Sequence, residues 1–248
     1  MAEAESALGK GLRVLEQLAR AGGAVRLSNL AADLGLQKSA VHRILQTLVE
    51  AGWATQEPDT GLYRASLKTW ELGTVIVGSL PVKQAATPVL HELHRTTGET
   101  VSLTVLDGDD VLYLEKLLAP RPIGFTTRVG SRVPAPLTVG GRALLAYEPD
   151  FEAVVDRLLA ERGEDLFDRK RALADIRKAR KDGYVVGRGR SERGIVGIAT
   201  AVPGDDGRAV AGLTVSAPVS RTDAARQADI VEALLDAAAR LGEAVGRR

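Results

Sequence analysis

The stretch GLQKSAVHRILQTL, residues 35–48, carries an apolar stripe and a polar stripe at helical spacing. The apolar positions recur at i, i+3, i+4 and i+7, and they are Val41, Ile44, Leu45 and Leu48. The polar positions on the other side are Lys38, Ser39, His42, Arg43 and Gln46. No acidic residue occurs between Leu34 and Val49. The pattern predicts an amphipathic helix whose outward face presents cationic and neutral hydrogen-bonding groups.

Two shorter helical patterns precede this helix. In SALGKGLRVLEQLARAGG, residues 6–23, Ser6 is the expected cap and the glycine pair at 22 and 23 ends the helix. Its expected inner face is Leu8, Leu12, Leu15 and Ala19. In RLSNLAADLGL, residues 26–36, Ser28 is the expected cap and Gly35 allows a sharp exit. The expected inner face of this second helix is Leu30, Ala31 and Leu34.

A hairpin follows the three helices. The segment GWATQEPDTGLYRAS, residues 52–66, contains two short runs typical of strands, separated by the turn residues 58–61. Three helices followed by a hairpin predict a winged helix-turn-helix, in which the third helix has the size to enter the major groove.

Two interpretations of the polar face of residues 38–46 are open. As a DNA reader, Arg43 offers a bidentate fork to guanine and Gln46 one to adenine, while Lys38 and Ser39 lie at the helix start, where phosphate binds. Arg64 and Lys68, beyond the hairpin tip, would then reach the adjacent DNA backbone or minor groove. The alternative is a solvated face with no specific role. The helix-turn-helix context favours DNA, with Lys38, Ser39, His42, Arg43, Gln46 and Arg64 as the expected contacts.

Composition limits the function classes. The chain has 248 residues, a net charge of +1 and no cysteine, which excludes disulfides, thiolate zinc sites and cysteine nucleophiles. Residues 1–80 contain eight basic and eight acidic residues, so DNA binding must depend on a local patch. No apolar run is long enough to span a membrane and no signal peptide is visible, so we expect a cytoplasmic protein.

The remainder of the chain predicts a second domain. Residues 66–79 read as a linker helix, with the domain boundary near 75–85, and a further helix ends at Gly98. One hairpin is expected over 100–117 and another over 194–218, where GDDG forms the turn. Helices are expected at about 140–148, 150–162 and 168–182, and a last helix places Ile230, Leu234, Ala238 and Leu241 on one side. The fold class is α+β.

The chain resembles the IclR family of bacterial transcriptional regulators. The resemblance rests on LSNLAADLGLQKSAVHRILQTLVEAGW, YRASLKTWELG, HELHRTTGETVSLTVLDGDDVLYLEKL, VPAPLTVGGRALLA, KARKDGYVV and GIVGIATAVPGDDGRAVAGLTVSAPVSR, in family order. It implies a winged helix-turn-helix over 1–65, a linker helix over 66–80 and a GAF-like effector-binding and oligomerisation domain over 81–248. It further implies a homodimer or tetramer on operator DNA, a small-molecule effector, and neither an enzyme nor a cofactor.

Transferred by resemblance, the effector pocket comprises Val139, Gly140, Gly197, Thr214 and Ser216. Thr214 and Ser216 are two apart on an expected strand, so both hydroxyls point to one face and could fix a carboxylate or carbonyl. The alternative is that they only satisfy backbone groups. After residues 182–186 the family usually has acids, whereas this chain has Arg188 and Arg190. An arginine-rich loop favours an organic or aromatic acid as the effector, and a loop without a specific role is the alternative.

Other signals are weaker. HELH, residues 91–94, lacks the spacing and third ligand of a zinc protease, and GGRALL is no phosphate loop. Trp70, Leu72, Val75, Ile76 and Val77 predict a dimer contact on the linker helix. Two rival functions stay open: an enzyme or metabolite-binding domain whose helix-turn-helix binds protein, and a sequence-blind DNA binder without effector.

Overall fold

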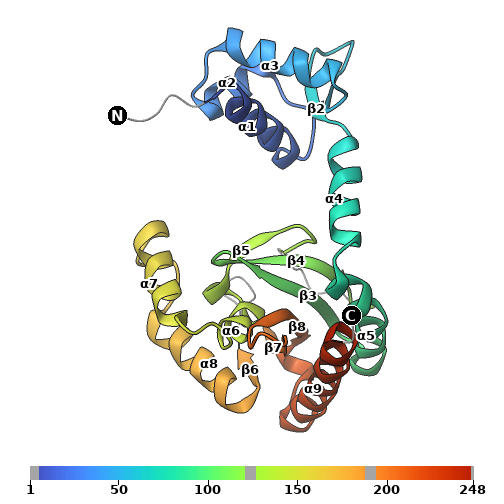
Figure 1. Cartoon of the computed structure of the whole chain (residues 1–248), viewed down its shortest axis with the longest axis vertical. Helices are drawn as coiled ribbons and strands as arrows, with labels where there is room; N and C mark the ends of the chain where they lie inside the picture. Colours follow the sequence, from blue (N-terminus) through green and yellow to red (C-terminus); the bar gives the residue numbers. More distant parts are fainter. Residues whose placement is uncertain (1–5, 121–126, 188–193, 247–248) are drawn as a thin grey trace. The chain divides into compact units, whose positions relative to one another are not determined.

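The computed structural model describes residues 6–120, 127–187 and 194–246, and these divide into two compact units between Gly78 and Ser79. The N-terminal unit contains four helices and a two-stranded sheet. These elements, which can be followed in Figure 1, are α1 (Ala7–Arg20), α2 (Leu27–Leu34), α3 (Lys38–Glu50), β1 (Ala54–Gln56), β2 (Tyr63–Ala65) and α4 (Lys68–Gly78). Three helices followed by an antiparallel hairpin confirm the winged helix-turn-helix.

The core of the N-terminal unit lies among α1, α2, α3 and the hairpin. Its buried side chains are Val14, Leu18, Leu30, Ala31, Val41, Leu45, Ala54 and Tyr63. The stripe predicted for α3 is therefore confirmed, with Val41 and Leu45 fully buried and Ile44 and Leu48 packed against the cluster.

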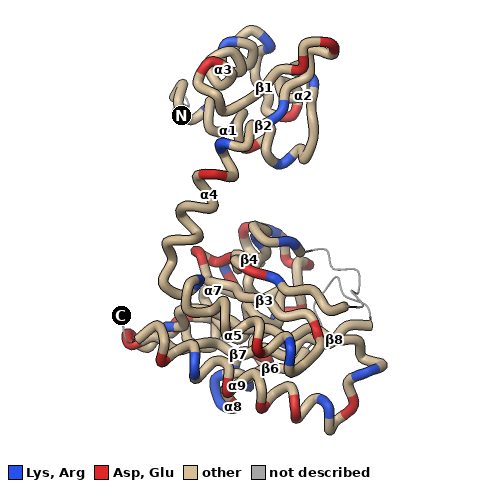
Figure 2. The backbone as a smooth tube through the Cα atoms, turned by 90° about the vertical axis from the view of Figure 1, so that its right-hand side faces the viewer, with Lys and Arg blue, Asp and Glu red and all other residues tan. Residues whose placement is uncertain are grey.

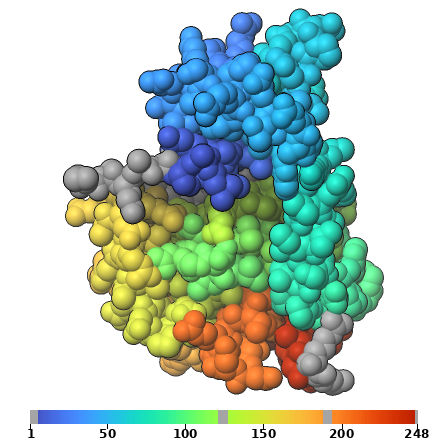
Figure 3. Space-filling view, turned by 45° about the horizontal axis from the view of Figure 1, so that its top comes forward, coloured from blue at the N-terminus to red at the C-terminus, as the bar shows by residue number. Residues whose placement is uncertain are grey.

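Two details of the helix predictions were wrong. The inner face of α1 is Val14 and Leu18, whereas Leu8 is 73% exposed and Leu12 is 58% exposed. Figure 3 shows α1, in dark blue, at the surface of its unit. Ser28 is not a cap, because α2 begins one residue earlier and Arg26 occupies the cap position without a side-chain bond. Ser6 does cap α1, since its Oγ accepts from the Gly9 N–H at 3.0 Å.

The C-terminal unit is an antiparallel six-stranded sheet with helices on both faces, in the strand order β5-β4-β3-β8-β7-β6. The strands are β3 (Thr100–Asp107), β4 (Asp110–Leu117), β5 (Arg132–Pro134), β6 (Tyr184–Gly187), β7 (Ile195–Pro203) and β8 (Ala209–Pro218). The helices are α5 (Pro81–Thr97), η1 (Ala135–Leu137), α6 (Val139–Leu145), α7 (Phe151–Arg162), α8 (Arg169–Asp182), η2 (Val219–Arg221) and α9 (Ala224–Gly246). This α+β unit confirms the expected class and is consistent with a GAF-like sheet; β5 and β6 are the strands that the sequence patterns did not predict.

Each face of the sheet has its own cover. Helices α5 and α9 contact one another and pack on β3, β7 and β8 from one side (Figure 1). Helix α6 packs on β7, β8 and β3 from the other side and is itself contacted by α8. All seven residues of α6 are buried. The face of the sheet that α6 covers is the inner face, and the first turn of α6 packs against it.

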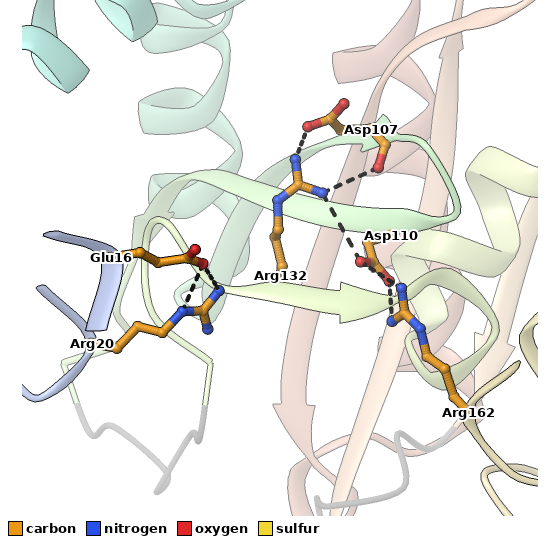
Figure 4. Close-up of polar contacts among 6 residues, drawn as sticks. All are labelled: Glu16, Arg20, Asp107, Asp110, Arg132 and Arg162. Atoms are coloured by element: carbon orange, nitrogen blue, oxygen red, sulfur yellow. Dashed lines mark hydrogen bonds and ion pairs between the residues drawn. The ribbon is translucent and has the colours of Figure 1, made fainter. Parts of the chain in front are cut away.

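Arginine–aspartate pairs hold the tip of the β3–β4 hairpin. Arg132 of β5 lies between Asp107 and Asp110 and interacts with both (Figure 4). Arg162 of α7 donates to both carboxylate oxygens of Asp110, at 2.7 and 3.1 Å. Such two-point contacts fix the geometry of a side chain more than a single contact does. Acidic and basic residues are interspersed along both units (Figure 2). Among the described residues of the C-terminal unit, many arginines form an ion pair with a nearby carboxylate.

The described helices include none with the length and apolar composition needed to cross a membrane.

Candidate DNA interface and effector site

The position of α3 is set by a tight turn and by its buried stripe. Helix α2 ends at Gly35, whose φ of 64° is in the left-handed region that glycine adopts without a Cβ penalty. Gln37 then caps α3 in an extended conformation. Because Val41 and Leu45 are anchored in the core, the opposite side of α3 faces solvent.

The outward face of α3 carries five polar side chains, all exposed: Lys38, Ser39, His42, Arg43 and Gln46. None of them makes a side-chain hydrogen bond or ion pair with another residue that the structure describes. Their donors and acceptors are thus available to a partner molecule. The first backbone N–H groups of α3, beside Lys38 and Ser39, add the anion preference of a helix N-terminus.

The wing differs from α3 because its arginine is already paired. Arg64 on β2 lies opposite Thr55 on β1, and its Nη2 donates to Oε1 of Glu57. Oε2 of Glu57 accepts from the hydroxyl of Thr60 at 2.8 Å. The Thr60 hydroxyl and the Arg64 guanidinium together hold the pKa of the Glu57 carboxyl below its ordinary value.

Lys68 was expected to reach DNA together with Arg64, but in the structure it has partners of its own. Its Nζ donates to the carbonyl of Ala51 at 2.9 Å and lies 4.8 Å from the ring centroid of Trp53. It therefore joins the start of α4 to the end of α3, and a cation held in this way is a weaker candidate for a DNA contact.

The residues transferred to the effector pocket meet at the first turn of α6. A Cβ built on Gly140 would stand 2.7 Å from the Thr214 hydroxyl, and one built on Gly197 would stand 2.9 Å from Cγ2 of Val139. Ser216 lies next to Gly197 in the β7–β8 register. The structure thus brings all five positions together.

Hydroxyl groups line the same inner face. Pairing in register places Ser102 beside Thr214 and Thr100 beside Ser216, and strand alternation adds Thr104. The Thr100 hydroxyl accepts from the Ala119 N–H at 3.0 Å, and that of Thr104 donates to the Gly212 carbonyl at 3.2 Å.

Three of these hydroxyls lack such a partner. Those of Ser102, Thr214 and Ser216 make no hydrogen bond with any described residue, although Ser102 is only 4% exposed and Ser216 only 8% exposed. The alternative was that the hydroxyls of Thr214 and Ser216 merely satisfy backbone groups. Neither hydroxyl forms a hydrogen bond with a backbone group of a described residue, which does not support that alternative. No buried side-chain oxygen of the described residues lacks a partner, so these three hydroxyl oxygens are accessible to water or to a ligand.

Two family models match the chain along most of its length. The model described as the IclR helix-turn-helix domain matches residues 7–58, and that of the bacterial transcriptional regulator IclR C-terminal matches residues 74–242. This chain belongs to the IclR family. It is a transcriptional regulator of that family, as its curated relatives are.

Individual IclR-family proteins agree along nearly the whole chain. The HTH-type transcriptional regulator XynR of Escherichia coli K12 is 30% identical over 241 residues, 96% of each chain. A putative transcriptional regulator from Rhodococcus sp. RHA1 superposes with a TM-score of 0.81 at 28% identity, covering 97% of this chain and 98% of that one. An IclR homologue from Microbacterium hydrocarbonoxydans, crystallised with 4-hydroxybenzoate, gives a TM-score of 0.83 at 26% identity, covering 98% and 100%.

Sequence reasoning missed one cation on the inner face of this IclR-family sheet. Lys116 of β4 pairs in register with Ser102, and its Nζ donates to the carbonyl and the hydroxyl of Thr127 at 3.0 and 2.9 Å. Its Nζ also lies 5.8 Å from the ring centroid of Tyr113. An irregularity in the β3–β4 register places both Tyr113 and Lys116 on this face, which simple alternation along β4 does not predict. Arg188 and Arg190, the arginines that the sequence singled out, lie outside the described residues.

A buried ion pair fixes α6 in this IclR-family unit. Arg142 is 6% exposed, and its Nη1 donates to Oδ2 of Asp175 on α8 at 2.7 Å. Its Nε donates to the carbonyl of Pro136 at 2.8 Å. Burial lowers the pKa of the Arg142 guanidinium from its ordinary value while Asp175 opposes the shift, and a guanidinium stays charged under all ordinary conditions. Among the described residues, no group of three or more histidines and carboxylates could hold a metal ion.

Proposed function

We propose that this IclR-family regulator reads a pseudo-palindromic operator with the outward face of α3 and changes its DNA binding when a small organic acid binds its C-terminal unit. In this scheme residues 1–65 bind DNA, residues 66–80 form the linker helix, and residues 81–248 bind the effector and oligomerise. The regulator acts in the cytoplasm and catalyses no reaction. The observation that carries the proposal is the set of five exposed side chains on α3 without a partner among the described residues. Arg43 and Gln46 are the expected base readers, whereas Lys38, Ser39, His42 and Arg64 position the protein on the backbone.

The proposed effector is an organic or aromatic acid. Lys116, whose Nζ donates to Thr127, supplies the cation at the inner face and would exchange or share these contacts with a carboxylate. The hydroxyls of Ser102, Thr214 and Ser216 supply hydrogen bonds beside the apolar wall of Val139. A carboxylate bound by a lysine and two hydroxyls, with an aromatic ring against apolar side chains, matches this arrangement. The 4-hydroxybenzoate bound by the Microbacterium homologue is an acid of this class. The effector would act by binding one of two arrangements of the DNA-binding units better than the other.

A homodimer, alone or within a tetramer, is the proposed assembly. The described residues include twelve exposed large apolar side chains, and eight of them belong to the N-terminal unit: Leu8, Leu12, Val49, Leu67, Trp70, Leu72, Val75 and Ile76. Helix α4 has no buried residue. A groove of about 790 Å³, lined by residues of α1 and α3 together with Trp53, adds to this apolar surface. A second copy is the partner that a two-fold symmetric operator requires.

A competition titration tests the proposal. Fluorescence anisotropy would follow binding to the DNA flanking the gene of this protein, at about physiological salt and with excess non-specific competitor. Arg43→Ala and Gln46→Ala are each expected to weaken operator binding by roughly 5- to 150-fold, the range of 1–3 kcal/mol for a bidentate base contact. Arg20→Ala is the matched control, because it removes an exposed arginine from α1, where it pairs with Glu16 (Figure 4).

The outcomes separate the three functions. Competitor-resistant binding that is lost in the α3 variants supports the regulator. Binding that is equally weak on every sequence and steeply salt-dependent indicates the sequence-blind binder. Absence of DNA binding, together with turnover of a ligand, would favour the enzyme.

A further inference from the structure

Arg64 is the exception among the side chains proposed to contact DNA. The five on α3 have no partner among the described residues, whereas Arg64 is paired with Glu57 within the same hairpin. The pair is accessible: the Arg64 side chain is 55% exposed and the Glu57 side chain 29% exposed. Any phosphate that approaches Arg64 therefore also approaches a carboxylate.

The turn fixes Glu57 at several points. Its N–H donates to the Leu62 carbonyl at 2.8 Å, and its carbonyl accepts from the Gly61 N–H at 2.9 Å. The Thr60 hydroxyl, which donates to Glu57, also accepts from the Leu62 N–H at 3.3 Å. The carboxylate is thus held by its own backbone and by Thr60 before it meets the guanidinium. This arrangement belongs to the turn and not to a mobile side chain that happens to find Arg64.

Pairing with Glu57 has two effects on Arg64. It orients the guanidinium, whose Nε and Nη1 donate to no described residue and stay available to phosphate. It also cancels the charge of Arg64, so the wing gains little from the release of counterions when it meets any DNA. The first effect helps a complex of fixed geometry, while the second weakens binding to all DNA.

We propose that Glu57 determines specificity: it masks the charge of Arg64 against non-specific DNA while it holds the guanidinium in position for the operator backbone. This inference rests on the proposed function, because it assumes that the wing lies on DNA. Non-specific binding depends almost wholly on charge, so it suffers from the masking in full. Operator binding depends also on the position of the Arg64 guanidinium. The fixed position therefore restores part of the affinity that is lost when the charge is masked.

Glu57→Gln is the test variant, because glutamine removes the charge and can still accept from Thr60. Affinity for random duplex DNA is expected to rise about 3- to 10-fold at low salt. The slope of log K against log salt should steepen by up to about 0.9, the value for one more phosphate neutralised. Operator affinity should change less than twofold, so the ratio of operator to non-specific affinity falls. Thermal unfolding of each variant checks that the wing still folds.

A double-mutant cycle with Arg64→Ala separates this role from simple repulsion between an acid and DNA. If Glu57 acts through Arg64, Glu57→Gln has almost no effect on the salt slope when Arg64 is already alanine. Asp59→Asn is the matched control: Asp59 is exposed on the same turn and pairs with no described residue, so its effect should be equal in both backgrounds.

Two results would overturn the inference while leaving the proposed function intact. In the first, the wild-type protein prefers its operator, and Glu57→Gln leaves the ratio of operator to non-specific affinity unchanged. In the second, Glu57→Gln changes the salt slope by the same amount in the wild-type and the Arg64→Ala backgrounds. A wild-type protein that shows no operator preference would instead overturn the proposed function, and the specificity role of Glu57 with it.

Discussion

Gly197 on β7 lies directly against Val139 in the first turn of α6. A Cβ at position 197 would stand 2.9 Å from Cγ2 and 3.2 Å from Cβ of Val139, closer than side chains pack. The absence of a side chain at 197 therefore allows α6 to approach β7 closely. Ser216 on β8 is the register partner of Gly197, so it lies beside this contact. This contact sets the distance between the helix start and the hydroxyls of the proposed effector site.

Gly197→Ala should consequently destabilise the C-terminal unit by about 1–3 kcal/mol, because Val139 must shift within a packed core. Adding Val139→Ala should cost less in the Gly197→Ala background than in the wild type, since the smaller side chain relieves the clash. Urea denaturation of the four proteins measures the coupling. Gly242→Ala is the control: its Cβ would lie 3.7 Å from Val202, an ordinary contact, so its unfolding free energy should be unchanged or slightly higher. If the losses of unfolding free energy from Val139→Ala and Gly197→Ala simply added in the double variant, the two positions would not be in contact as described.

The buried pair of Arg142 and Asp175 leads to a second prediction. Arg142→Met should cost about 3–5 kcal/mol of unfolding free energy, because Asp175 then loses its partner at a site where its side chain is only 19% exposed. The double variant Arg142→Met with Asp175→Leu should recover much of that loss.

The comparison pair for this experiment is Arg169 with Asp156, at 2.5 Å but about half exposed on both sides. Arg169→Met should cost far less unfolding free energy than Arg142→Met, because an ion pair that solvent screens contributes little to stability. Equal losses for Arg142→Met and Arg169→Met in urea denaturation would show that burial of the first pair does not matter.

The effector site gives a third prediction. Ser216→Ala and Lys116→Met should each weaken binding of an aromatic acid by about 10-fold or more, because each removes a polar contact with the acid. The measurement is isothermal titration with 4-hydroxybenzoate as the acidic probe and 4-hydroxybenzamide as its neutral analogue. Lys116→Met should reduce the preference for the acid, whereas Ser216→Ala should weaken both probes.

Lys170→Met controls for loss of a lysine elsewhere, since Lys170 is exposed on α8 and pairs with no described residue. If Lys116→Met bound the acid as well as Lys170→Met does, the cation of the site would have to come from another residue.

The sequence predicted those elements in which one periodic stripe dominates. Helix α3 has a single apolar stripe, and its burial followed the prediction. Helix α1 has two, one through Leu8 and Leu12 and one through Val14 and Leu18, and periodicity alone cannot decide which of them meets the core. The structure buries the second stripe, which leaves Leu8 and Leu12 exposed.

The candidate site was predictable only in part for a similar reason. Family resemblance supplied Val139, Gly140, Gly197, Thr214 and Ser216, and the fold brings them together although more than 50 residues of chain separate Gly140 from Gly197. Lys116 was missed because an irregular register displaces it from simple alternation. Glu57 was missed because its importance depends on a hydrogen bond from Thr60 and on the cross-strand reach of Arg64, and neither is visible in residue order.

Helix α4 provides the last prediction, which concerns assembly. Val75 is 69% exposed on a helix without a buried residue, and covering it with a second copy would stabilise the pair by the hydrophobic effect. Val75→Glu should therefore produce monomers in sedimentation equilibrium and weaken binding to the full operator far more than to a half-site. Ile76→Glu should act in the same way. Thr74→Glu, which adds the same charge at an exposed neighbour, is the control and should stay dimeric. A dimer that survives both Val75→Glu and Ile76→Glu would place the contact elsewhere, and the groove lined by Leu8, Leu12 and Trp53 is the next surface to test.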